Sequence, residues 1–172
     1  MGNLATPDSL IARWHEVLVD PSLKDLPYKI EINAWGKVEM SPASNRHGRL
    51  QAFISAEFAR QLPGGIIITE CSILTRIGIR VPDVVWGSES FMKDFGEITP
   101  YMQAPEICVE IISPSNVEAE IQAKTAAYLA VGAREVWIVS ESGAIRIVGP
   151  AGDKARSGFP VRMTLPGASP KP

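Results

Sequence analysis

APEICVEIISPSN, residues 104–116, holds charged Glu110 inside an otherwise apolar run. Residues 107–112 are apolar on both sides of Glu110, which predicts a buried strand. A helix is expected from about Ser115 to Val131, ended by Gly132, and residues 136–139 predict a second buried strand. Strands interspersed with helices in this way favour an α/β fold (α+β in detail), with a mixed sheet flanked by helices.

The other predicted elements extend outward from this unit. Helical spacing of apolar residues predicts helices over 8–19 and 44–62. β-rich runs predict strands over 28–32, 37–40, 66–74, 79–86 and 144–148, and residues 87–104 are expected to form a loop. A chain of 172 residues suits one domain, which we place at 1–165, with a loose tail at 166–172.

Composition narrows the class of protein. The chain has 17 Lys and Arg against 19 Asp and Glu, and 45% of its residues are hydrophobic. These values exclude a disordered chain and a strongly basic nucleic-acid coat protein. No apolar run reaches the roughly 18 residues of a membrane helix, and the N-terminus does not resemble a secretory signal. Cys71 and Cys108 lie in apolar runs, so we expect core positions in a cytoplasmic protein with no membrane partner.

Two carboxylates lie where the pattern expects apolar side chains. Asp83 follows Pro82 within an apolar run, where a carboxylate is costly to bury unless it is paired or binds a cation. Glu110 points along an apolar strand face, where a nearby cation would keep it ionised. The alternatives are a solvent-facing strand end for Asp83 and a structural salt bridge for Glu110.

Lys124 lies in the middle of an apolar stripe on the helix that follows Ser115. The stripe consists of Val117, Ile121, Lys124, Tyr128 and Val131. A lysine is almost never fully buried without a partner, so Lys124 is a candidate for the same site. The alternatives are a surface ion pair with Glu120 and a second stripe of alanines that would move Lys124 toward the rim.

Asp83, Glu110 and Lys124 together are the minimal set for metal-assisted hydrolysis of a phosphodiester. Two carboxylates on neighbouring strands can hold a hard divalent cation through oxygen ligands. A lysine beside the cation can orient or help deprotonate water, and it can stabilise charge on a phosphoryl oxygen.

Several segments carry a resemblance to a known family. Pro82-Asp83 followed after 27 residues by Glu110 resembles the PD-(D/E)XK nuclease signature. Residues 40–42 with 47–48, 81–86, 104–116 and 132–139 resemble the Uma-two family of that superfamily, which is grouped with restriction endonucleases. The resemblance extends over about residues 28–148, and it implies a restriction-endonuclease-like core.

The resemblance also implies roles for individual residues. It makes Asp83 and Glu110 ligands of Mg²⁺ (or Mn²⁺), with the backbone carbonyl of Ile111 as a further ligand. The superfamily has a lysine two positions after the second acid, where this chain has Ile112. In the family the lysine comes from the following helix, where Lys124 stands.

Four further residues are candidates for supporting roles. His47 and Gln51 lie one turn apart on the second helix and match family positions, so they could contact metal-bound water or phosphate. Glu57 lies on the same helix but roughly 80° away from His47 around the axis. Glu70 lies in a strand near Asp83, where it either supports the site or pairs with an arginine.

The sequence therefore predicts a Mg²⁺-dependent endonuclease that acts on DNA. We expect a homodimer, because cutting both strands of a duplex calls for two active sites. Arg46 and Arg49 could contact phosphate, whereas the aromatic residues between 86 and 101 either stack on bases or pack on the core. The alternative is a catalytically silent nuclease fold that serves as a binding or assembly module.

Overall fold

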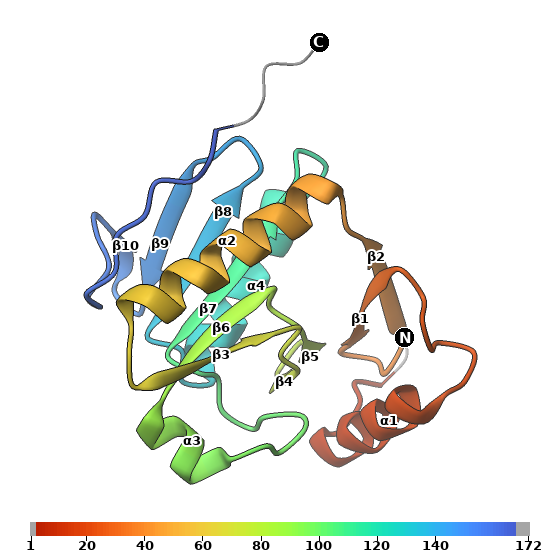
Figure 1. The fold of residues 1–172 in the computed structure, drawn as a ribbon. Helices are drawn as coiled ribbons and strands as arrows, with labels where there is room; N and C mark the ends of the chain where they lie inside the picture. Colours follow the sequence, from red (N-terminus) through yellow and green to blue (C-terminus); the bar gives the residue numbers. More distant parts are fainter. Residues whose placement is uncertain (1–2, 168–172) are drawn as a thin grey trace.

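The computed structural model describes residues 3–167 and arranges them as two β-sheets with helices packed around them (Figure 1). The larger sheet has strand order β10-β9-β8-β7-β6-β3, and only the β7–β8 pair is parallel. Its strands are β3 (Gly65–Thr69), β6 (Val84–Ser88), β7 (Ile107–Ile112), β8 (Glu135–Ser140), β9 (Ile145–Gly149) and β10 (Gly152–Lys154). The predicted mixed sheet flanked by helices is confirmed.

A second sheet of four antiparallel strands was not predicted. Its order is β2-β1-β5-β4, with β1 (Tyr28–Asn33), β2 (Val38–Pro42), β4 (Ile73–Thr75) and β5 (Gly78–Arg80). It forms because the predicted strands 66–74 and 79–86 are each divided in two. Glu70 has a left-handed φ of 54° and ends β3, while residues 81–83 separate β5 from β6. Pro82 has no N–H to donate to a ladder, which favours the break.

Four helices cover the sheets. They are α1 (Pro7–Val19), α2 (Asn45–Gln61), α3 (Glu89–Phe95) and α4 (Glu118–Ala130). Helix α2 crosses one face of the larger sheet, α4 lies behind the opposite face, and α1 lies beside the smaller sheet (Figure 1). Leu50, Ile54 and Phe58 recur every four residues on α2 and are fully buried against that sheet. Helix α2 begins where the Ser44 hydroxyl accepts from the N–H of His47 at 3.0 Å.

Helix α3 corrects the expectation of a loop over 87–104. The Ser88 side chain caps it by accepting from the N–H of Phe91 at 3.1 Å, and Gly96 with a φ of 57° ends it. Phe91 packs on Phe95 and Tyr101, with ring centroids 4.8 and 5.0 Å apart. These rings belong to the core, so packing and not base stacking accounts for them.

The C-terminal part of the chain follows β10 across the α2 side of the larger sheet. Val161 and Leu165 are buried in the same core cluster as α2. Of the tail predicted at 166–172, residues 168–172 lie outside the described residues. None of the helices within residues 3–167 combines the length and apolar character needed to cross a membrane.

Candidate functional site

A cleft of about 770 Å³ lies where elements of both sheets come together. Its walls are β1 and β2 on one side, and on the other the start of α2, the end of β7 and the start of α4. Glu110, Lys124, His47, Glu70 and Ile111 all line this cleft. Most of the residues that the sequence nominates are therefore gathered in one place.

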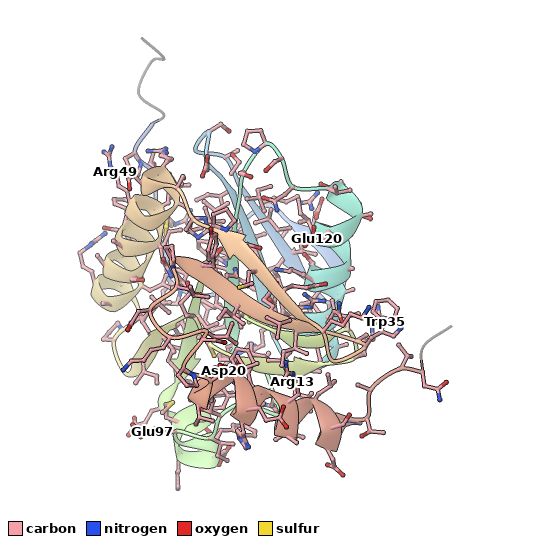
Figure 2. All side chains as sticks on the ribbon, turned by 90° about the vertical axis from the view of Figure 1, so that its right-hand side faces the viewer. Arg13, Asp20, Trp35, Arg49, Glu97 and Glu120 are labelled. Atoms are coloured by element: carbon pink, nitrogen blue, oxygen red, sulfur yellow. The ribbon has the colours of Figure 1, made fainter. Side chains whose placement is uncertain are left out.

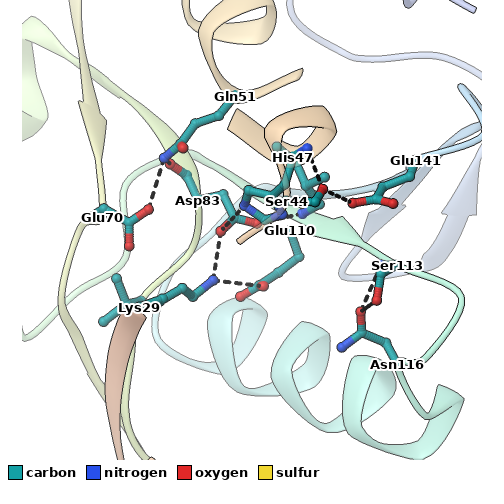
Figure 3. A network of polar contacts seen from close by, with 12 residues as sticks. Lys29, Ser44, His47, Gln51, Glu70, Asp83, Glu110, Ser113, Asn116 and Glu141 are labelled. Atoms are coloured by element: carbon teal, nitrogen blue, oxygen red, sulfur yellow. Dashed lines mark hydrogen bonds and ion pairs between the residues drawn. The ribbon is translucent and has the colours of Figure 1, made fainter. Parts of the chain in front are cut away.

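Asp83 lies beneath the cleft with its side chain fully buried. Its Oδ1 accepts from Lys29 Nζ at 2.7 Å and lies 3.1 Å from His47 Nε2, while Oδ2 accepts from the N–H of Ile111 at 2.6 Å (Figure 3). Burial by itself would raise the pKa of Asp83, but the Lys29 charge and the His47 hydrogen bond hold it at about 2. Asp83 is therefore a carboxylate, and the solvent-facing alternative is wrong.

Glu110 projects from β7 toward α4. Its Oε1 accepts from the Tyr128 hydroxyl at 2.6 Å, and its Oε2 lies 3.5 Å from Lys29 Nζ and 3.7 Å from Lys124 Nζ. Lys29 thus stands between the two carboxylates of Asp83 and Glu110 (Figure 3).

Lys124 reaches the cleft from α4, and its side chain is only 11% exposed. Its Nζ lies 2.8 Å from Glu31 Oε2 and donates to Glu31 Oε1 at 3.0 Å. Glu120 is exposed at the rim of the same cleft, near the start of α4 (Figure 2), whereas the ion-pair partners of Lys124 among the described residues are Glu31 and Glu110, so the alternative of a surface pair with Glu120 is not what the structure shows. Burial would lower the pKa of Lys124, but the Glu110 and Glu31 charges outweigh it and raise that pKa. The side chain is therefore an ammonium.

Sequence reasoning missed Lys29 and Glu31, both of which lie on β1. The alternation of Lys29 and Glu31 with apolar residues predicts a strand with one face in solvent. In the structure, the face that carries these two charges points into the site instead. Glu31 also accepts from the N–H of Val81 at 2.8 Å, and its Oε2 lies 3.3 Å from Arg80 Nη1. The only signal available was that Lys29 and Glu31 occupy alternate positions, which puts two opposite charges on one strand face.

Three of the four auxiliary candidates reach the site. The hydrogen bond to Asp83 raises the pKa of His47. Gln51 Nε2 donates both to the backbone carbonyl of Asp83 at 2.8 Å and to Glu70 Oε1 at 2.9 Å (Figure 3). Burial raises the pKa of Glu70, although Gln51 and Lys29 oppose that effect.

Two other nominated residues on α2 make contacts elsewhere. Glu57 accepts from Arg60 Nη2 at 2.6 Å and from Gln61, near the far end of the helix. Arg46 donates to the backbone carbonyls of Glu141 and Pro166, at 3.1 and 2.5 Å. Arg46 therefore joins the start of α2 to the C-terminal part of the chain and is occupied by contacts within the protein.

The oxygen atoms at this site have the chemistry that a hard divalent cation prefers. Asp83 and Glu110 supply carboxylates, and the N–H of Ile111 that bonds Asp83 shows which edge of β7 faces that carboxylate. Because N–H and C=O of one residue point to the same side of a strand, the Ile111 carbonyl is directed the same way. Among residues 3–167, no group of three or more His, Cys, Asp or Glu side chains is placed to hold a metal. Asp83, Glu110 and Ile111 offer two carboxylates and one carbonyl, which is fewer side-chain ligands than such a group would supply.

Comparison with known proteins identifies the family. The family model described as "Uma2: Putative restriction endonuclease" matches residues 21–156, so the chain belongs to the Uma2 family. A crystal structure described as a putative nuclease belonging to DUF820, from Anabaena variabilis ATCC 29413, has a TM-score of 0.60 and 19% sequence identity. The match covers 70% of this chain and 72% of that chain, and it confirms the nuclease-like fold. No curated protein matches this chain.

Proposed function

We propose that this protein is a divalent-metal-dependent endonuclease that hydrolyses phosphodiester bonds of DNA in the cleft. The observation that carries the proposal is the convergence of Asp83, Glu110 and Lys124 from three separate segments of the chain. Lys29 Nζ lies within 3.5 Å of both carboxylates, and Lys124 Nζ lies 3.7 Å from Glu110. Membership of the Uma2 family supports the same chemistry.

Asp83, Glu110 and the carbonyl of Ile111 would hold Mg²⁺ or Mn²⁺. Such a cation, when bound, polarises a phosphoryl oxygen and makes a bound water more acidic. The depressed pKa of Asp83, about 2, keeps this carboxylate charged at any pH where the enzyme would work. Buried surroundings strengthen the attraction between such a charge and a cation.

Lys124 acts as a charged donor in this proposal. Its raised pKa argues against proton abstraction, because a general base must be able to give up its own proton first. An ammonium in this position orients the attacking water and stabilises negative charge on the phosphoryl group. Glu31 fixes its direction through the contacts at 2.8 and 3.0 Å.

His47, Gln51 and Glu70 support the site from its wall. His47 orients the Asp83 carboxylate, and Gln51 ties the Asp83 backbone to Glu70. Glu70 keeps a left-handed φ of 54°, which costs a residue other than glycine about 1 kcal/mol or more. A strained residue persists where the surrounding structure holds it, and this favours a functional role for the Glu70 carboxylate.

The second candidate is a nuclease fold that serves as a binding or assembly module without catalysis. Lys29 favours it, because the ammonium already neutralises part of the charge that would attract a metal. The two candidates differ in one observable property, which is metal-dependent cleavage.

The test is cleavage of supercoiled plasmid and of single-stranded DNA with Mg²⁺ or Mn²⁺. Asp83→Ala and Lys124→Ala are expected to abolish cleavage while staying folded, and Glu57→Gln, outside the cleft, is expected to retain it. A parent protein that is inactive on every nucleic acid tried, and that binds no metal by calorimetry, would contradict the enzyme and leave the binding or assembly module in its place. Light scattering on the same samples tests the homodimer, which is part of this proposal.

A further inference from the structure

Lys29 is placed as a cation shared by two acidic side chains. Its Nζ lies 2.7 Å from Asp83 Oδ1 and 3.5 Å from Glu110 Oε2, and its side chain is 13% exposed (Figure 3). The ammonium enters from β1, which belongs to the smaller sheet, whereas Glu110 lies on β7 of the larger sheet and Asp83 immediately precedes β6 of that sheet. Lys29 therefore links the two sheets through charge.

The charges at the site explain why this lysine is needed. Asp83 and Glu110 together carry two negative charges, and buried like charges repel strongly. Lys124 is held mainly by Glu31, at 2.8 Å, and lies farther from Glu110, at 3.7 Å. His47 lies 3.1 Å from Asp83 only, so Lys29 is the cation that contacts both carboxylates of the Asp83–Glu110 pair.

A divalent cation and this ammonium compete for the same oxygen atoms. A divalent ion bound by Asp83 and Glu110 would balance their charge without help, and a lysine left between them would repel it. We propose that Lys29 is an internal counter-cation, which holds the Asp83–Glu110 pair until a divalent metal binds and then leaves both carboxylates. This inference rests on the metal-dependent function proposed above.

The surroundings of Lys29 allow such a movement. Strand β1 is held in place between β2 and β5. The lysine side chain is flexible, so its rotation alone can move the ammonium away from the two carboxylates. Glu70 lines the same cleft and offers a new partner, since its bond to Gln51 uses only one of its two carboxylate oxygens. The ammonium can therefore exchange one acidic partner for another within the cleft.

Calorimetric titration with Mn²⁺ at constant ionic strength tests the proposal. Lys29→Met removes the competitor, so its Mn²⁺ dissociation constant is expected to fall by about tenfold or more relative to the parent. Lys154→Met is the matched control, because Lys154 also pairs with a buried carboxylate, that of Glu135, but lies outside the cleft. This control is expected to bind Mn²⁺ as the parent does.

A second measurement covers the risk that Lys29→Met folds poorly. Mn²⁺ is expected to raise the melting temperature of Lys29→Met by more than that of the parent, because the metal replaces the missing charge. The proposal is overturned if Lys29→Met binds Mn²⁺ no tighter than the parent and gains no more in melting temperature. If the parent shows neither heat nor a thermal shift with Mn²⁺, the metal-dependent function is overturned too. The two failures are distinguishable, because failure of the Lys29 proposal alone leaves Mn²⁺ binding by the parent intact.

Discussion

Lys124 carries the sharpest prediction for a single side chain. We expect Lys124→Met to lower the rate of DNA cleavage by about 100-fold or more, because the variant loses a charged donor to the phosphoryl group. Glu31 keeps the N–H of Val81 and the guanidinium of Arg80 as partners, so the variant is expected to fold. Initial rates of plasmid nicking at saturating Mn²⁺ measure the effect, and a variant as fast as the parent would remove Lys124 from the mechanism.

Single residues also show what the sequence can reveal about the site. Asp83, Glu110 and Lys124 were predictable because each interrupts an apolar pattern, and burying a charge without a partner is costly. Lys29 and Glu31 were not, because a charged residue at every second position is typical of a strand with one face in solvent. Only the position of the smaller sheet turns that face into one wall of the cleft.

At the scale of elements, the β1–β2 hairpin positions the lysine of α4. Glu31 on β1 and Glu39 on β2 both contact Arg80 Nη1, at 3.3 and 2.7 Å, but only Glu31 also contacts Lys124. We expect Glu31→Gln to lower the cleavage rate by about tenfold, because the ammonium loses the charge that directs it. The Michaelis constant for DNA is expected to change little.

Glu39→Gln is the matched control for this hairpin prediction. This change also removes a carboxylate from Arg80, but the Glu39 side chain is 45% exposed and makes no ion pair with Lys124 among the described residues. Its cleavage rate is expected to equal that of the parent. If Glu31→Gln and Glu39→Gln lose the same cleavage rate, the hairpin affects cleavage through Arg80 and the stability of the fold, and not by directing Lys124.

Glu135 on β8 anchors the segment that follows β10. Its buried carboxylate accepts from the N–H of Gly158 at 2.6 Å and the hydroxyl of Ser157 at 2.7 Å, and it pairs with Lys154. Burial alone would raise the pKa of Glu135, but these hydrogen bonds hold it below the ordinary 4.5. The resulting stability is present above pH 4.5 and is lost as the pH falls through the depressed pKa.

This linkage predicts how acid affects the free energy of unfolding. We expect that free energy to fall in the parent as the pH drops below 4.5, and to fall less steeply in Glu135→Gln. At about pH 7, the variant is expected to be less stable by about 1 kcal/mol or more, since Lys154, whose side chain is 34% exposed, loses its ionic partner. Urea unfolding at several pH values measures both effects, and parallel pH profiles would show that Glu135 does not contribute in this way.

Elements differ in how well the sequence predicts them. Helix α2 was predictable because Leu50, Ile54 and Phe58 repeat at helical spacing between Ser44 and a Pro-Gly terminator. Helix α3 is the shortest of the four helices in the described residues, and seven residues are too few for periodicity to stand out from a polar loop. The division of 79–86 has a local signal in Pro82, which has no N–H for a strand ladder, whereas the division of 66–74 at Glu70 depends on how the two sheets meet.

At the scale of the whole molecule, the cleft exists only where the two sheets meet. Strand β7 of the larger sheet supplies Glu110, the residue just before β6 is Asp83, and the smaller sheet supplies Lys29 and Glu31. The family resemblance nominates the residues that we propose hold the metal, because their spacing along the chain is specific. It could not predict the charges that surround them, since those come from segments distant in sequence.

The most direct test of this account is anomalous X-ray scattering from a crystal of the protein soaked in Mn²⁺. The account predicts one strong manganese peak in contact with the carboxylates of Asp83 and Glu110, and with the carbonyl of Ile111. It also predicts that the Lys29 ammonium has moved away from both carboxylates. A crystal with no peak at this position, and with Lys29 still between Asp83 and Glu110, would contradict the proposed metal site.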